Sequence, residues 1–197
     1  GVARLATRPG SAWLKNAEFP VPRVVRSPHP RPGAGGYDKG RAWRFEPLVE
    51  AFTADGAWRG HPATLLVHAE GPYAGGVWAS FGVDDPAWYR EPAVLDALGA
   101  VARQMRRGLF FLDAGSNHYT YFEDQRARLG ARVINTGAQS AEVEVAVSAG
   151  PAREKRSLTL EPGATAAAEW DGPTGGSMPR EGIDVTARLL SSGELAD

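Results

Sequence analysis

Residues 92–112, PAVLDALGAVARQMRRGLFFL, decide the fold of this chain, because a helical pattern passes there directly into an apolar run. Apolar side chains recur at three- and four-residue spacing, which is typical of an amphipathic helix. Pro92 stands where a first helical turn tolerates proline, and Gly108 stands where helices commonly end. The pattern predicts a helix over residues 92–107 and a short buried strand over Leu109–Leu112.

Three strand-like runs precede this helix. Turn signals rich in glycine and proline separate them, and they lie at residues 44–52, 63–68 and 77–83. Alternation of large and small residues in the third run makes Trp78 and Phe81 its most core-like side chains. We therefore interpret residues 42–125 as an α/β unit of order β-β-β-α-β, in which a small mixed sheet packs against one main helix.

The opening of the chain has a different character. Residues 1–41 are rich in proline and glycine, most densely between Pro20 and Gly40. Proline lacks a backbone N–H and glycine weakens regular elements, so we expect neither a helix nor a central strand there. We interpret this segment as an extended, linker-like connection that arrives from something upstream.

From Arg126 onward the sequence changes to short alternating runs separated by turns. Such a series is typical of an antiparallel sandwich, and we expect an immunoglobulin-like β-sandwich over residues 126–197. The alternating runs are fewer than the usual seven or so strands, so the sandwich is either incomplete at its C-terminal end or borrows strands from the preceding unit. The expected fold class of the chain is thus α+β or α/β, followed by this sandwich.

The composition excludes several classes of function. The formal net charge is -1, so no overall field favours nucleic acid. Cysteine is absent, which excludes disulfides and every cysteine nucleophile. The histidines lack the spacing of a zinc motif, and we expect no metal and no cofactor. No window approaches the roughly 20 apolar residues of a membrane span.

Acidic residues near strand ends are the strongest candidates for chemistry. Asp113 opens a polar run that contains His118 and Tyr119 and follows a buried strand, the position where α/β folds place ligands. Asp84 and Asp85 would form a carboxylate pair with Asp113, as in a glycosidase, if these strand ends converge. The alternative is turn chemistry, in which an aspartate accepts hydrogen bonds from free backbone N–H groups.

Aromatic side chains are frequent in the first half of the chain. Trp58, Trp88 and Tyr119 are the candidates for stacking on sugar rings, because a flat ring offers a platform for a pyranose. The alternative is that these rings pack in a small core, where aromatics also predominate. Exposure of the three rings on one face decides between the two interpretations.

A resemblance enters at residues 71–82, GPYAGGVWASFG, and at residues 107–112, RGLFFL. They look like the region behind the catalytic barrel of large bacterial glycoside-hydrolase-like proteins, where a glutamine-amidotransferase-like domain precedes an immunoglobulin-like module. The resemblance covers residues 42–125 for the first part and 126–197 for the second. It implies a degenerate amidotransferase scaffold, because the cysteine nucleophile of that chemistry is missing, and a role in assembly or at an active-site entrance.

These observations lead to three hypotheses. The first is a non-catalytic accessory fragment of a larger bacterial carbohydrate-processing protein, which by itself is not an enzyme. Its partners would be the remainder of that polypeptide or an oligomer partner, and its compartment that of a secreted or periplasmic parent. The second is a carbohydrate-binding module that uses exposed aromatics. The third is a glycoside hydrolase built on the aspartate pair.

Overall fold

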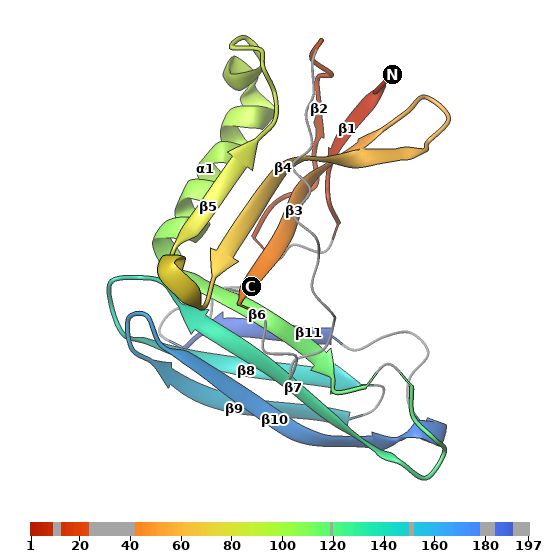
Figure 1. Ribbon diagram of the computed structural model, residues 1–197, viewed down its shortest axis with the longest axis vertical. Coiled ribbons are helices and arrows are strands. Elements are labelled where there is room, and N and C mark those ends of the chain that lie inside the picture. Colours follow the sequence, from red (N-terminus) through yellow and green to blue (C-terminus); the bar gives the residue numbers. More distant parts are fainter. Residues whose placement is uncertain (10–12, 24–41, 119, 150–151, 178–183, 191–197) are drawn as a thin grey trace. The chain divides into compact units, whose positions relative to one another are not determined.

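The computed structural model of this chain describes residues 1–9, 13–23, 42–118, 120–149, 152–177 and 184–190 (Figure 1). Its contacts divide the chain into two compact units that interleave along the sequence. Pairing is antiparallel in the described sheets, and the described residues contain one α-helix. Unit 1 consists of Gly1–Pro32, Phe45–Val67 and Val77–Arg106, and unit 2 of Gly33–Arg44, His68–Gly76 and Arg107–Asp197.

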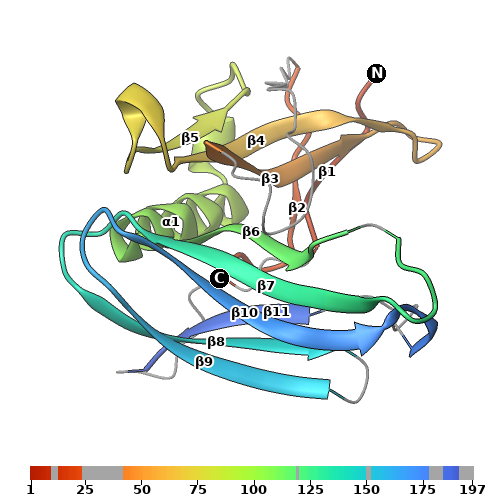
Figure 2. The same ribbon diagram turned by 60° about the horizontal axis from the view of Figure 1, so that its bottom comes forward.

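Unit 1 is built on a five-stranded sheet of order β2-β1-β3-β4-β5. The helix α1 (Pro92–Arg107) lies against one face of this sheet (Figure 2). A single turn of 3-10 helix, η2 (Trp88–Arg90), precedes it. The strands are β1 (Arg4–Thr7), β2 (Glu18–Phe19), β3 (Trp43–Phe52), β4 (Trp58–His68) and β5 (Val77–Phe81).

One face of the sheet carries the core of unit 1. Leu5 in β1 lies opposite Ala51 in β3, and both side chains are buried. Leu65 in β4 is fully buried and lies opposite Ala79 in β5. Residues opposite one another across antiparallel strands share a face, so the apolar positions of neighbouring strands add up to one buried surface.

The helix α1 has the bounds that its apolar spacing predicts, and Gly108 follows it with a φ of 72°. A side chain at position 108 is also excluded by space, because a Cβ there would lie 2.2 Å from the backbone nitrogen of Gly137. The carbonyl of Gly108 accepts hydrogen bonds from the backbone N–H and the hydroxyl of Thr136. Glycine at this position therefore ends the helix and lets two turns of unit 2 meet.

Unit 2 is a sandwich of two three-stranded antiparallel sheets, of order β10-β7-β6 and β11-β8-β9. Alternate residues of both sheets meet in one core, among them Leu129, Val145 and Trp170. Its elements are β6 (Leu109–Ser116), β7 (Arg126–Asn135), β8 (Ala141–Ala149), β9 (Ala152–Leu160), β10 (Thr165–Thr174), β11 (Asp184–Leu189) and the 3-10 turns η1 (Gly71–Tyr73) and η3 (Gly175–Ser177).

The strand after α1 belongs to the sandwich, which corrects the expected β-β-β-α-β unit. β6 pairs with β7, and Leu109 lies opposite Asn135. The unit boundary in this part of the chain thus falls after Arg106 and not at residue 125. An apolar run suits burial in either sheet, so the sequence does not say which sheet receives it. With antiparallel pairing and a borrowed strand, the fold is α+β.

The linker-like interpretation of residues 1–41 is wrong for its first part. β1 and β2 lie within this segment, and β1 is an interior strand that pairs with both β2 and β3. The prolines that argue against strands begin at Pro9, after β1 has ended. The stretch where proline and glycine are densest, residues 24–41, lies outside the described residues.

The expectation that Trp78 is a core residue is also wrong. Trp78 and Phe81 are three positions apart, whereas residues on one face of a strand are separated by an even number. Trp78 is 49% exposed, and Phe81 lies opposite the buried Ala63. β5 therefore turns its largest side chain away from the core of unit 1.

The buried side chain of Asn135 forms hydrogen bonds to backbone groups in the neighbouring turns of unit 2. Its buried side-chain nitrogen donates to the carbonyls of Gln139 and Leu160, at 2.8 and 2.9 Å. Its side-chain oxygen accepts from the backbone N–H of Gly137 at 2.9 Å. Removal of such an amide leaves several buried groups unsatisfied, which costs more than one ordinary hydrogen bond.

Asn135→Ala should lower the free energy of unfolding by about 2–4 kcal/mol, because three backbone groups lose their partner. Urea unfolding followed by tryptophan fluorescence measures the change. Gln139→Ala is the control, because it removes an exposed side chain and keeps the Gln139 carbonyl, and it should cost less than about 0.5 kcal/mol. Equal, small effects of the two variants would contradict the role given to Asn135.

Candidate functional site

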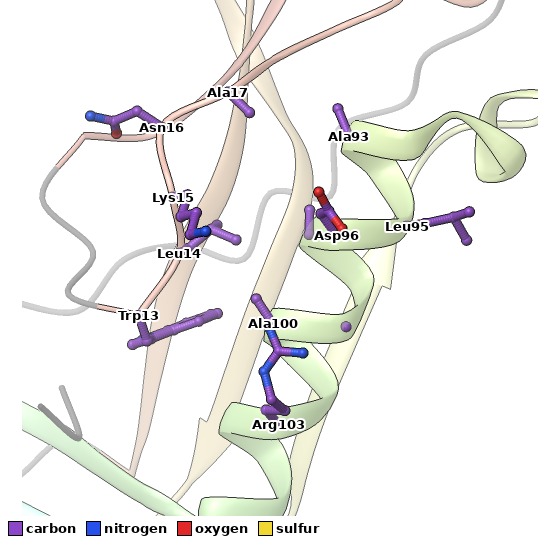
Figure 3. A pocket seen from close by; sticks show the side chains of 12 residues that line it. Trp13, Leu14, Lys15, Asn16, Ala17, Ala93, Leu95, Asp96, Ala100 and Arg103 are labelled. Carbon is purple, nitrogen blue, oxygen red and sulfur yellow. The ribbon is translucent and has the colours of Figure 1, made fainter. Parts of the chain in front are cut away.

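In unit 1, residues 13–17 lie opposite α1 and leave between them a hollow of about 360 Å³ (Figure 3). The segment is held in place by Thr7 of β1, whose hydroxyl proton is shared between the carbonyls of Lys15 and Ala17, at 3.1 and 3.0 Å from Oγ1. Leu14 is buried and anchors the same segment. One wall of the hollow is thus a fixed loop, and the other is the helix.

The lining of this hollow combines apolar surface with a few polar groups. Lys15 and Arg103 supply two cations, and Asp96 supplies one carboxylate. The Nε1–H group of Trp13 is buried and has no hydrogen-bond partner among the described residues. A buried N–H group without a hydrogen-bond partner destabilises the fold, and a ligand or a water that accepts a hydrogen bond from it removes this cost. These groups suit a small ligand that has an apolar body and an acceptor or anionic group.

Gly99 lets the guanidinium of Arg103 lie along the helix. The two residues are one helical turn apart, and a Cβ at Gly99 would lie 3.3 Å from Arg103 Nη1. This spacing is tighter than ordinary van der Waals contact, so a side chain at position 99 would require the guanidinium to move by a few tenths of an ångström. Gly99 therefore leaves room for the Arg103 side chain along this wall of the hollow.

A second hollow of about 430 Å³ lies beside the first and shares Asn16 and Ala17 with it. Arg4 of β1 dominates its lining. The guanidinium of Arg4 contacts Glu18 at 3.3 Å and lies over the ring of Phe52, 4.5 Å from its centroid. Because Glu18 already pairs with the Arg4 guanidinium, this hollow offers an anionic ligand less than the first.

Asp84 and Asp85 precede the turn that leads to α1. Asp84 is exposed, and the carboxylate of Asp85 accepts a hydrogen bond from the backbone N–H of Ala87 at 2.9 Å. This is the arrangement that the turn interpretation expects of an aspartate two residues before a free N–H. Asp85 therefore has a structural task in this turn.

Asp113 lies inside β6 and not in a loop after it, which corrects its expected position. Its side chain is 1% exposed, and its Oδ2 accepts from Arg132 of β7, 3.0 Å from Nη2 and 3.3 Å from Nε. Glu70 contacts the same guanidinium at 3.7 Å. Since β6 and β7 are antiparallel, the rule that places ligands at the ends of parallel strands does not apply here.

The structure does not bring the three aspartates together within one unit. Asp84 and Asp85 belong to unit 1 and Asp113 to unit 2. His118 is exposed, and its backbone N–H donates to the hydroxyl of Tyr121, which itself donates to Asn117. These contacts hold the turn between β6 and β7.

The proposed aromatic platform is not formed by Trp58 and Trp88. Trp58 is 50% exposed, but Trp88 is 4% exposed and donates from its indole nitrogen to the carbonyl of Pro20 at 2.8 Å. The ring of Trp88 also packs against Phe19, with centroids 6.1 Å apart. Trp88 is therefore a core residue, and Tyr119 lies outside the described residues.

The hollow beside α1 was missed by sequence reasoning. Trp13 and Lys15 fall in a segment that proline and glycine mark as a connection, and Asp96 and Arg103 read as the solvated side of a helix. The available signal was the adjacent pair of large apolar residues, Trp13 and Leu14, in this opening segment. Such a pair indicates contact with a core, although not with which element.

Neither family models nor curated proteins contain a match to this chain. Within the described ranges, no group of three or more histidine, aspartate and glutamate side chains is arranged to hold a metal ion. The helix that these ranges contain is too short and too polar to cross a membrane. Function must therefore be argued from the contacts themselves.

Arg132→Met should destabilise the protein by about 3 kcal/mol, because it leaves the buried Asp113 carboxylate without its guanidinium. Arg128→Met, on the same strand, is the matched control. Arg128 contacts Glu169 at 3.8 Å with both side chains exposed, and its loss should cost at most about 1 kcal/mol. Urea unfolding of both variants gives the comparison. Similar losses of unfolding free energy in the two variants would show that the buried Asp113–Arg132 pair contributes no more to stability than the exposed Arg128–Glu169 pair.

Unit 1 should lose stability at alkaline pH through Tyr89. Burial raises the pKa of the Tyr89 hydroxyl, and the nearby Asp84 carboxylate raises it further. A raised pKa in the folded state means that stability is intact below the unfolded value of about 10 and is lost as pH rises through the folded value.

Unfolding free energies measured between about pH 8 and pH 11 test this dependence. In Tyr89→Phe the alkaline decline should be shallower than in the parent chain, although the variant starts from a lower stability because the bond to Val83 is gone. A decline of the same slope in both proteins would contradict the assignment to Tyr89.

Proposed function

We propose that this chain is a non-catalytic accessory module of a larger carbohydrate-processing protein. The observation that supports the proposal most is the state of Asp113, whose side chain is 1% exposed and accepts from the guanidinium of Arg132. A general acid or nucleophile must reach the scissile bond of its substrate, and a carboxylate enclosed in this way does not.

Three further polar groups support the same proposal, because each of them makes a hydrogen bond that holds a turn. Asp85 accepts a backbone N–H in a turn, Asn135 joins turns of the sandwich, and Tyr121 ties together the turn that contains His118. Of these residues, Asp85 and His118 are the ones that the sequence offers as candidates for chemistry. Their engagement favours an architectural role over a hydrolase.

We further propose that unit 2 is a shortened immunoglobulin-like module. In that fold, strands A, B and E share one sheet with B in the middle, and C lies between C′ and F in the other sheet of variable-type domains. The orders β6-β7-β10 and β9-β8-β11 match these two arrangements. No described strand takes the places of D and G.

The carbohydrate context comes from the resemblance of residues 71–82 and 107–112 to glycoside-hydrolase-like proteins. The partner in this proposal is the remainder of such a polypeptide. The alternative, a carbohydrate-binding module, retains Trp58 as a half-exposed ring but loses Trp88 to the core. One ring makes a weaker platform than a row of rings, so the accessory role is favoured.

The test is a titration of the purified chain with a panel of glycans, followed by tryptophan fluorescence and by an assay for released reducing sugar. We expect neither saturable binding nor sugar release from the folded chain. Trp58→Ala and Trp78→Ala form a matched pair, because the two indoles have almost equal exposure, 50% and 49%.

Two results would contradict the accessory role. Saturable binding that Trp58→Ala abolishes and Trp78→Ala leaves intact would identify a carbohydrate-binding module. Sugar release that Asp113→Asn abolishes, in a variant that remains folded by circular dichroism, would identify a hydrolase. Either result would mean that this chain has a binding or catalytic site of its own and is not only a structural part of a larger protein.

A further inference from the structure

The strands at the margins of the described sheets differ in how they are protected against pairing with another chain. An exposed strand edge invites such pairing, and proteins usually blunt it with charge, a bulge or short length. β2 is protected by its length of two residues, and β6 by a register shift in its pairing with β7. The remaining margins, β9, β10 and β11, carry charged residues: Arg153, Glu154, Lys155 and Arg156 on β9, Glu169 and Asp171 on β10, and Asp184 on β11. β5, with the sequence VWASF, has none of these devices.

The register of β5 shows which of its backbone groups face outward. Pro62 accepts from the backbone N–H of Gly82, and His68 donates to the carbonyl of Gly76, which fixes the alternation of bonds between β4 and β5. Even-numbered residues of β5 therefore bond to β4. The backbone N–H and C=O groups of Val77, Ala79 and Phe81 point to the other side, where no described strand pairs with them.

An apolar flank of α1 lies on the same side of unit 1. Leu95 is 53% exposed, and Leu98 and Ala102 follow it at helical spacing on that flank. Leu95 is among the residues that line the hollow beside residues 13–17, and Figure 3 shows its side chain pointing away from those residues. Residues 13–17 lead into β2 at the far margin of the sheet, so the side chain of Leu95 extends toward the margin that β5 forms.

From these features we infer that β5 pairs antiparallel with β5 of a second copy, around a two-fold axis at Ala79. The pairing would join two five-stranded sheets into one continuous sheet. Each of the three facing pairs, Val77 with Phe81, Ala79 with itself and Phe81 with Val77, would exchange two backbone hydrogen bonds, about six in all. The inference goes beyond the proposed function, because it holds whether or not the chain is catalytic.

The side chains of β5 favour a second copy over an unrelated strand. In this register Trp78 of each copy lies opposite Ser80 of the other, so a large exposed side chain meets a small exposed one twice. No charge on β5 opposes its own image across the axis. On the other face of the joined sheet the two α1 helices lie side by side, and the Leu95 flanks face each other.

The interface is small, so the dimer should be reversible and concentration-dependent. Sedimentation velocity of the whole chain over a series of concentrations measures it. Ser80→Asp places a carboxylate against Trp78 of the second copy, and Leu95→Glu places a carboxylate between the helices. Each should weaken dimerisation by at least about tenfold. Ser157→Asp, at an exposed serine on β9, is the matched control and should leave it unchanged.

The register is tested by exchanging the two facing side chains. Trp78→Ser alone removes a contact, and Ser80→Trp alone sets two tryptophans against each other, so each single variant should dimerise more weakly. The double variant Trp78→Ser/Ser80→Trp restores a large side chain opposite a small one and should recover most of the loss. A double variant that is weaker than both singles would overturn the register.

Cross-linking gives an independent result, because the chain has no cysteine of its own. Facing residues of a hydrogen-bonded antiparallel pair have Cα atoms about 5.5 Å apart, within the range of a disulfide. Ala79→Cys should therefore form a disulfide-linked dimer under mild oxidation, whereas Ser157→Cys should not. A parent chain that is monomeric at every concentration, with no cross-link in Ala79→Cys, would overturn the inference.

Discussion

Unit 2 depends on the meeting of two turns at Gly108 and Gly137, where the backbones approach so closely that a Cβ at Gly108 has no room. This approach fixes where β6 starts relative to β7, with Leu109 opposite Asn135. Asn135 then holds the neighbouring turns through buried hydrogen bonds, and the alternating residues of both sheets fall into one core. A residue larger than glycine at position 108 would force these two backbones apart and would disturb the register on which this core relies.

The polar groups described above are of two kinds. Some hold the fold through hydrogen bonds within the chain, and others face outward and are able to bond to a ligand or to another chain. Asp113, Asp85 and Asn135 belong to the first kind, because each has a named partner within hydrogen-bond distance. The hollow beside α1 and the open edge of β5 belong to the second kind. Among the described residues, the hollow and the strand edge are therefore the two places where a ligand or another chain would find polar groups to contact.

Local patterns were sufficient for α1 and for the strands that became β3, β4 and β5, because periodicity and turn residues act within a few positions. They were insufficient for β6, whose apolar run suited either sheet, and for β1, which is too short to give a periodic signal. The candidate site was harder, because Asp113 meets Arg132 only through strand pairing. The burial of Trp88 and the hollow near Trp13 arise from contacts between segments far apart in sequence.

The interleaving of the two units has a consequence for how such a protein can change. Residues 33–44 and 68–76 belong to unit 2 although they lie within the stretch that builds unit 1, and Arg44 donates to the carbonyl of Phe111 while Glu70 contacts Arg132. No single cut separates two complete units, since each needs chain from both sides of the other. Recombination of gene segments, which moves contiguous domains from one protein to another, would therefore have to transfer this pair as one inseparable cassette.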